Sequence, residues 1–179
     1  MPLLARSNEE VHLFLDLNPC DCGGEDAARD SAVSLDGDRW LVRYTCICAR
    51  CGRQREVVFR QPASPARPAV GGWSVGDEPS QLLDAGEWLW VSDMFAGAPA
   101  EVDGLDREEA ARAREDLAAA GGALDEVVKF LPAGADEVPD SAFWTERGRQ
   151  VWQAEPGRFR RERLAAVRDR YHALLADQR

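Results

Sequence analysis

Hydrophobic and polar positions along this chain change their spacing, from the period of a strand in the first third to that of a helix afterwards. Apolar residues alternate with polar or outward positions over residues 11–17, which predicts a half-buried strand. Residues 40–46 and 56–61 are rich in β-branched and aromatic side chains and predict two further strands. The polar, small residues 24–38 predict a loop or a weak hairpin.

Helical signals begin beyond residue 80. Asp84-x-x-Glu87 has the pattern of a capping box and predicts a helix that runs to about residue 96. Asp106-x-x-Glu109 is a second such box and predicts a helix to about residue 120, where Gly121-Gly122 supplies a stop or a weak joint.

The helical pattern continues to the end of the chain. An apolar face persists past the two glycines until Pro132, and Asp140 or Ser141 could cap a short helix that carries Phe143 and Trp144. Pro156 suits the start of a last amphipathic helix. Trp88 and Trp90 lie two positions apart, so one helix cannot bury both, and one of them is expected at a rim or an interface.

These elements predict an α+β protein with a β-rich part at residues 1–61 and a helical part of about four helices at residues 73–179. Between them, residues 62–72 contain three prolines and two glycines and predict a linker. We expect the small sheet to pack on the helical part, so that the whole chain could form one compact domain.

Charge is distributed unevenly around a formal net charge of −10. Residues 74–140 hold 4 basic and 17 acidic side chains, whereas residues 141–179 hold 9 basic and 5 acidic ones. An acidic field disfavours nucleic acid and attracts basic proteins, although acidic side chains also serve solubility alone. The candidates for an exposed acidic face are Asp103, Asp106, Glu108, Glu109, Asp125 and Glu126.

Cysteines are concentrated in one short region. All five, at positions 20, 22, 46, 48 and 51, lie within 32 residues. The N-terminus has no secretory signal pattern and no apolar run could span a membrane, which predicts a cytoplasmic, reducing location where such clusters bind metal rather than form disulfides. Cys20-Asp21-Cys22-Gly23 and Cys48-Ala49-Arg50-Cys51-Gly52 predict two metal-binding turns.

The two turns, set at the ends of predicted strands, resemble the paired knuckles of zinc-ribbon modules over residues 11–61. The first turn departs from that pattern, because one residue rather than two separates its cysteines. We expect one structural Zn²⁺ per chain, held by Cys20, Cys22, Cys48 and Cys51. Cys46 would then be a buried thiol, although Cys46 could replace Cys48 as the third ligand. Arg50, Arg53 and Arg55 could offset the charge of four thiolates.

No motif for catalysis is visible. The chain has two histidines and one lysine, and it lacks a phosphate-binding loop, a dinucleotide fingerprint and the zinc-deaminase and His-Glu-x-x-His patterns. A redox role for Cys48 and Cys51 lacks the helix that would lower a thiol pKa.

Three functions stay open. The first is a non-enzymatic interaction module, for example a small acidic bacterial immunity or antitoxin-type protein that binds a basic partner. The second is a nucleic-acid-associated zinc ribbon that uses Arg50, Arg53 and Arg55 and the arginine-rich residues 158–170. The third is an enzyme whose site the sequence does not reveal.

Overall fold

The computed structural model describes residues 2–37, 39–62, 73, 76–97 and 106–177. It divides the chain into two compact units, and each is described by itself. The first, here called the N-terminal unit, comprises Met1–Arg67 and Ser80–Leu82; the second, the helical unit, comprises Pro68–Pro79 and Leu83–Arg179. The described residues form a four-stranded sheet and five α-helices, so the protein is α+β. Of the expected linker at residues 62–72, only Pro62 is described.

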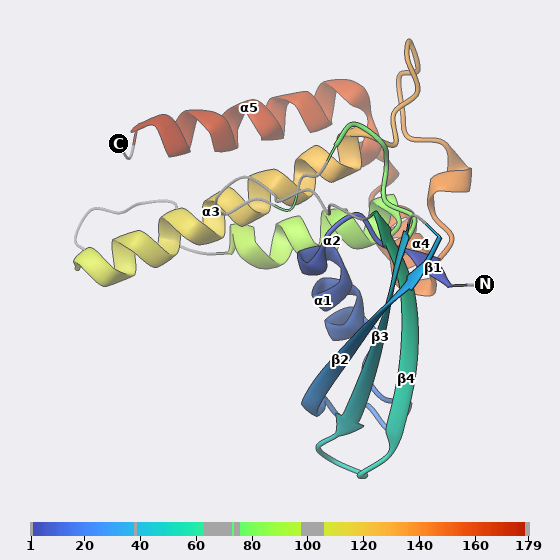
Figure 1. The fold of residues 1–179 in the computed structure, drawn as a ribbon. Coiled ribbons are helices and arrows are strands. Elements are labelled where there is room, and N and C mark those ends of the chain that lie inside the picture. Colours follow the sequence, from blue (N-terminus) through green and yellow to red (C-terminus); the bar gives the residue numbers. More distant parts are fainter. Residues whose placement is uncertain (1, 38, 63–72, 74–75, 98–105, 178–179) are drawn as a thin grey trace. The chain divides into compact units, whose positions relative to one another are not determined.

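The sheet of the N-terminal unit has the strand order β1-β4-β3-β2 (Figure 1). Strands β3 (Arg39–Cys48) and β4 (Gln54–Pro62) confirm the two β-rich predictions, and they pair antiparallel. The short β1 (Leu3–Leu4) pairs parallel with β4. Strand β2 (Asp26–Asp36) occupies the other edge, where a loop or weak hairpin was expected. That prediction was wrong because an edge strand exposed along nearly its whole length needs no apolar pattern and is held by its pairing with β3.

Residues 11–17 were expected to form a strand, and they are part of a helix, α1 (Asn8–Leu17). The alternation arises because α1 is buried over most of its circumference, and its exposed positions Asn8, Glu9, His12 and Asp16 follow the helical spacing of three to four. Its N-cap, Ser7, accepts a hydrogen bond from the backbone N–H of Glu10. The helix lies on the sheet through edge-to-face contacts of His12 with Tyr44 and Phe14 with Phe59.

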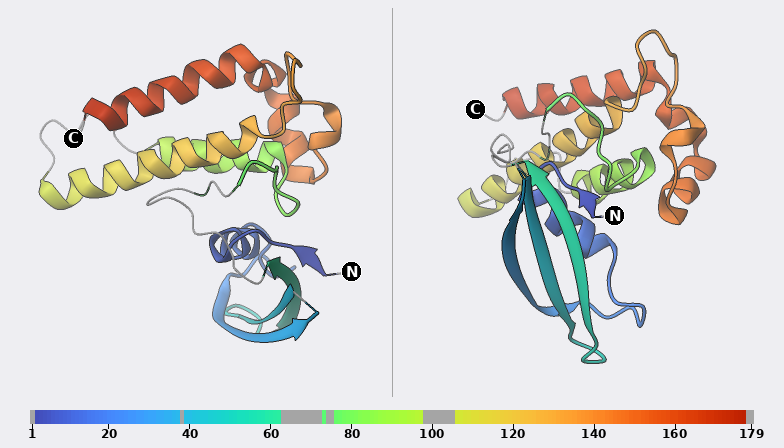
Figure 2. Two further views of the ribbon diagram at one scale, coloured as in Figure 1. Left: turned by 45° about the horizontal axis from the view of Figure 1, so that its top comes forward. Right: turned by 45° about the vertical axis from the view of Figure 1, so that its right-hand side comes forward.

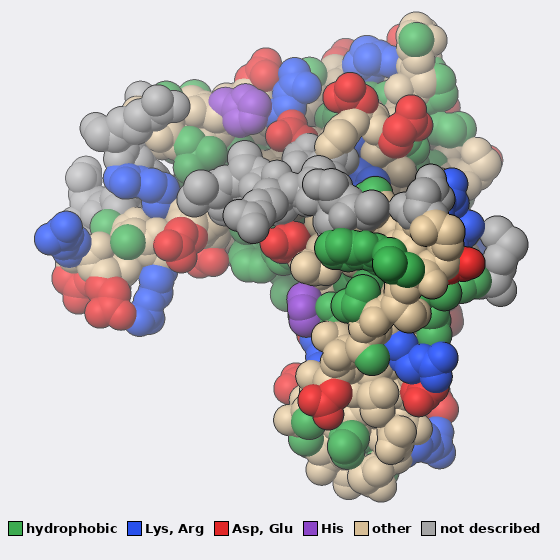
Figure 3. Space-filling view, in the orientation of Figure 1, with side chains coloured by type: hydrophobic (Ala, Val, Ile, Leu, Met, Phe, Trp, Pro, Cys, Tyr) green, Lys and Arg blue, Asp and Glu red, His purple; other side chains and the backbone are tan. Residues whose placement is uncertain are grey.

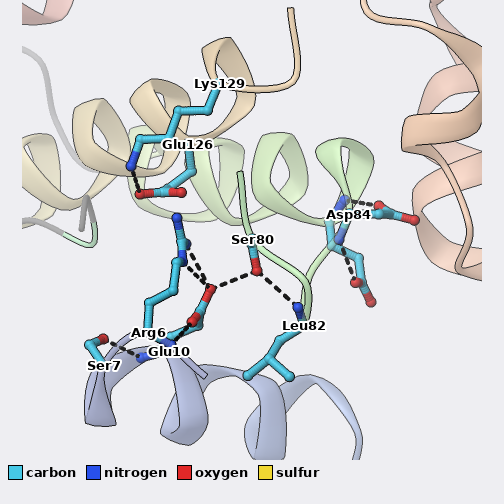
Figure 4. Close-up of polar contacts among 9 residues, drawn as sticks. Arg6, Ser7, Glu10, Ser80, Leu82, Asp84, Glu126 and Lys129 are labelled. Atoms are coloured by element: carbon cyan, nitrogen blue, oxygen red, sulfur yellow. Dashed lines mark hydrogen bonds and ion pairs between the residues drawn. The ribbon is translucent and has the colours of Figure 1, made fainter. Parts of the chain in front are cut away.

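A buried carboxylate fixes the start of α1. Glu10 accepts hydrogen bonds from the backbone N–H of Arg6 (2.7 Å) and from its guanidinium (2.7 and 3.0 Å) (Figure 4). The Ser80 hydroxyl donates to the same carboxylate at 2.6 Å and accepts from the N–H of Leu82. The segment Ser80–Leu82 is thereby tied to the N-terminal unit although it lies far along the chain.

The helical unit contains α2 (Ala85–Ala96), α3 (Arg107–Val128), α4 (Glu146–Ala154) and α5 (Arg161–Asp177). Helices α2 and α5 both run antiparallel to α3 and lie alongside it (Figure 2). Both expected capping boxes are confirmed, at Asp84 with Glu87 and at Asp106 with Glu109. Each box satisfies backbone N–H groups that a helix start would otherwise leave unpaired.

Three details of the helical unit differ from the sequence predictions. Gly121-Gly122 does not stop a helix, because α3 continues through it to Val128. Phe143 and Trp144 follow a single 3₁₀ turn, Asp140–Ala142, and the next helix is capped by Thr145 instead. Pro156 begins a second 3₁₀ turn, Pro156–Phe159, which precedes α5.

The core of the helical unit holds one of the two neighbouring tryptophans. Trp88 is completely buried, whereas Trp90 is half-buried with the Arg147 guanidinium 5.0 Å from its ring centre, as the spacing of the pair predicted. The expected exposure of Glu126 was wrong, since Glu126 is buried and accepts a hydrogen bond from Lys129 at 2.6 Å. None of the helices in the described ranges combines the length and apolar character that a membrane crossing requires.

Candidate metal centre

Four cysteine thiols of the N-terminal unit converge on one point. The sulfur atoms of Cys20, Cys22, Cys48 and Cys51 all lie within 4.8 Å of one another and could hold a metal ion. Cys20 Sγ lies 3.6 Å from Cys51 Sγ, and Cys22 Sγ lies 3.5 Å from Cys48 Sγ. Each close pair therefore joins one cysteine of the first turn to one of the second.

The first turn follows the end of α1. The N–H of Gly23 donates to the carbonyl of Cys20 at 2.7 Å, and the N–H of Cys20 donates to the carbonyl of Gly24. Gly23 has a φ of +75°, a conformation that other residues rarely adopt. A Cβ atom on Gly24 would lie 2.8 Å from Cys48 Sγ and 2.5 Å from Arg50 Cβ, so only glycine lets the two turns approach this closely.

The second turn connects β3 to β4. Cys48 is the last residue of β3, and its carbonyl accepts from the N–H of Gly52, whose φ is +68°. The N–H of Cys48 donates to the carbonyl of Arg53, and the N–H of Ala49 donates to the carbonyl of Glu25. These bonds fix Cys48 and Cys51 at the closed end of a hairpin, beside the start of β2.

Arginines of the second turn hold the first turn in place. Arg50 Nη1 donates to the carbonyl of Cys22 at 2.9 Å, and Arg53 Nη1 lies 2.6 Å from a carboxylate oxygen of Asp21. Arg55 points into the unit and donates to Asp26 at 2.8 Å and to the carbonyl of Asn18. The arginines that the sequence marked as charge partners or nucleic-acid contacts thus make contacts within the unit.

The four thiols differ in exposure and in acidity. Cys20 and Cys48 are buried, Cys22 is half-buried and Cys51 is exposed. Backbone N–H groups of Cys51 and Arg50 favour the Cys48 thiolate and lower its pKa to about 7 against the effect of desolvation. The N–H of Gly24 acts to lower the pKa of Cys22. The neighbouring thiols and desolvation together have the larger effect and raise this pKa to about 12. A metal ion would displace the remaining protons on binding, because thiolates are the ligands.

Cys46 lies outside this group. It is completely buried, and desolvation followed by the nearby Asp26 carboxylate raises the pKa of its thiol. Desolvation opposes ionisation of Asp26, but hydrogen bonds from Arg55 and Arg29 hold its pKa below the ordinary value. Cys46 therefore stands beside a buried ion-pair cluster, whereas Cys48 stands in the four-thiol group.

The spacing of the cysteines predicted the two turns, but it did not predict the residues that support them. Gly24 and Asp26 lie in a segment expected to be irregular, and nothing in their local pattern marks them. Ser7-x-x-Glu10 does have the capping-box pattern that would have identified α1. No family model, curated protein or solved structure matches this chain.

Proposed function

We propose that this chain is a non-enzymatic protein-interaction protein whose N-terminal unit is organised by one structural Zn²⁺. The ligands are Cys20, Cys22, Cys48 and Cys51. The observation that carries the proposal is the convergence of these four thiols, from two turns far apart in the sequence, to within 4.8 Å.

The chemistry of four thiols supports zinc in a structural role. A tetrahedral Zn²⁺ with Zn–S bonds of about 2.3 Å separates its sulfur ligands by about 3.8 Å. The two close pairs, at 3.5 and 3.6 Å, lie near this spacing. Soft thiolates favour Zn²⁺ over hard cations, and a four-protein-ligand site leaves no position for water or substrate. The ion would therefore stabilise the fold rather than take part in a reaction.

Variants of the cysteines test the ligand set. We expect Cys51→Ser to lose the zinc that the purified wild-type protein carries, because structural zinc requires all four thiolates. Cys46→Ser is the matched control, since its thiol lies outside the group, and it should retain the metal. Zinc that persists in Cys51→Ser but disappears in Cys46→Ser would refute the ligand set.

The partner that we propose is a basic protein that contacts the helical unit. The first half of α3 and its cap expose Asp106, Glu108, Glu109 and Glu115, although Arg107, Arg112 and Arg114 lie among them. Figure 3 shows this mixture of acidic and basic side chains at the end of α3 where the helix begins. Other acids of residues 74–140 serve the fold: Asp84, Glu87 and Glu126 are buried, and Asp93 pairs with Arg158. Asp103 lies outside the described residues.

Salt dependence tests the acidic surface. We expect association with a partner recovered by affinity capture to slow about tenfold between low and high salt, because steering is screened over a Debye length of about 10 Å at 0.1 M. Glu108→Lys with Glu115→Lys should slow it further and leave the thermal midpoint nearly unchanged, since both side chains are exposed. Asp77→Lys with Glu162→Lys reverses the same charge elsewhere and is the control. Association that ignores salt and the α3 reversals alike would refute the basic-partner proposal.

A further inference from the structure

Strand β2 (Asp26–Asp36) presents an open edge of the sheet. Among the strands of the described residues its one neighbour is β3, so about half of its backbone N–H and C=O groups face away from the sheet (Figure 1). Such a row is a template for another strand, and natural sheets protect it with very short strands, charged side chains, proline or β-bulges. β2 is 11 residues long and contains neither lysine nor proline; its irregularity lies at its start, between Asp26 and Ala28, and its charged residues must be accommodated by the register of any added strand.

The same strand carries the most exposed large apolar side chains among the described residues. Val33 is 60% exposed and Leu35 is 72% exposed. They lie two positions apart, on one face of the sheet, and their cross-strand partners are Val42 and Trp40. Val42 is buried, so this is the face that holds the core of the N-terminal unit. A strand paired with the free edge of β2 would extend the sheet on that side and place its own side chains next to Val33 and Leu35.

We propose that two copies of this chain associate through β2, with the strands antiparallel about a two-fold axis beside Ala32. The two four-stranded sheets would then form one continuous sheet. In such a pairing opposite residues share a face of the sheet, so the allowed registers differ in steps of two residues.

Charge selects the register centred on Ala32. In it, Arg29 lies opposite Leu35 and Asp30 lies opposite Ser34, so no two like charges face each other. The alkyl part of Arg29 would also cover the exposed Leu35 of the other copy.

Neighbouring registers are electrostatically worse. The register centred on Ser31 places Asp26 opposite Asp36, and the one centred on Val33 places Asp30 opposite Asp36. The register centred on Ala32 also begins its pairing at Ala28 and so avoids the irregularity between Asp26 and Ala28. Among these three registers, only the one centred on Ala32 has no like charges opposite each other, and this match favours a second copy over an unrelated strand.

Sedimentation equilibrium of the full chain tests the proposal. We expect a dimer at concentrations of about 100 μM. Because Ala32 faces its own copy, Ala32→Lys and Ala32→Asp should each raise the dimer dissociation constant about tenfold or more by like-charge repulsion. An equimolar mixture of these two variants should dimerise again, because each lysine then faces an aspartate.

Two controls keep the test decisive. Ala111→Lys and Ala111→Asp make the same changes at an exposed alanine of α3 and should leave the dissociation constant unchanged. Ser34→Lys would face Asp30 and should tighten the dimer severalfold. A wild-type chain that stays monomeric in this range, or a dimer that is insensitive to both charges at Ala32, would overturn the proposal. Neither outcome bears on the zinc ligands or the basic partner, which are measured separately.

Discussion

The two units stabilise their local structure in different ways. In the helical unit, side chains complete the hydrogen bonds of the helix starts: Asp84 and Asp106 cap α2 and α3, and Thr145 caps α4. In the N-terminal unit, four thiols meet at two turns, one after α1 and one between β3 and β4, and backbone hydrogen bonds together with Arg50 and Arg53 hold these turns in place. A small unit with a limited core commonly relies on a bound metal or another crosslink, whereas a larger helical core does not.

Asp84 serves two helices of the helical unit at once. One of its carboxylate oxygens accepts from the N–H of Glu87 at 2.9 Å, and the other accepts from the N–H and hydroxyl of Thr145 at 2.7 and 2.8 Å. One buried side chain thus caps α2 and holds the cap of α4. The structural consequence is that this junction is complete without an ion.

Metal removal should give the largest difference in stability between the two units. We expect a strong zinc chelator to unfold the N-terminal unit, because structural zinc binding is folding free energy of about 10 kcal/mol or more. Backbone amides of β3 and β4 should lose protection from hydrogen exchange, while those of α2 and α3 keep it. Equal loss of protection in both units would contradict the comparison, and zinc readdition should restore protection.

Removing the shared cap should damage only the helical unit. We expect Asp84→Ala to lower its free energy of unfolding by about 3 kcal/mol, because three donors lose a buried acceptor. Asp106→Ala removes an exposed cap of the same type and should cost about 1 kcal/mol. Denaturant unfolding followed by tryptophan fluorescence measures both. Similar losses in the two variants would mean that burial of Asp84 adds nothing.

Close packing at the same junction gives a somewhat smaller effect. A Cβ atom on Gly148 would lie 2.0 Å from Asp84 Oδ1, so Gly148→Ala should cost about 2 kcal/mol. Gly157 has open space around it, and Gly157→Ala should change stability little. Thermal unfolding compares the two alanine variants, and a Gly148→Ala protein as stable as Gly157→Ala would argue against the packing of α2 on α4.

Acid should affect the units in opposite directions. The pKa of Asp26 is lowered in the folded state, so its ion pairs stabilise the N-terminal unit above the ordinary carboxyl pKa and are lost as pH falls through the lowered pKa. The pKa of Glu87 is raised by burial and by Asp84, so protonation from the raised pKa down to the ordinary one favours the folded helical unit.

Conservative amides test these two carboxyls. Asp26→Asn should reduce the acid sensitivity of the N-terminal unit, and Glu87→Gln should flatten the pH dependence of the helical unit. Thermal midpoints between about pH 3 and pH 7 measure both. An unchanged pH profile in Glu87→Gln would show that this carboxyl does not titrate differently on folding.

Local signals were predictable from the sequence, and contacts between distant residues were not. The boxes at Asp84 and Asp106 and the strands around residues 40–46 and 56–61 depend on neighbours within a few positions, and the structure confirms them. α1 was mistaken for a strand because burial on several sides erased its apolar stripe, and β2 was missed because pairing alone holds an exposed edge.

The same division applies to the candidate metal centre: the sequence predicted its ligands but not the residues that support them. The paired spacing predicted the ligands Cys20, Cys22, Cys48 and Cys51, because each pair lies on one short turn. The supports of the centre come from other elements: Gly24 leaves room for Cys48 Sγ, and Arg50 spans the two turns. The burial of Glu126 next to Lys129 likewise depends on tertiary packing, which helical spacing alone does not determine.

The metal content of the wild-type protein tests the central claim most directly. Elemental analysis and native mass spectrometry of protein purified without added metal should give about one zinc per chain, with four thiols protected from alkylation until the metal is removed. Protein that contains no zinc and whose five cysteines all react freely in the native state would contradict the account.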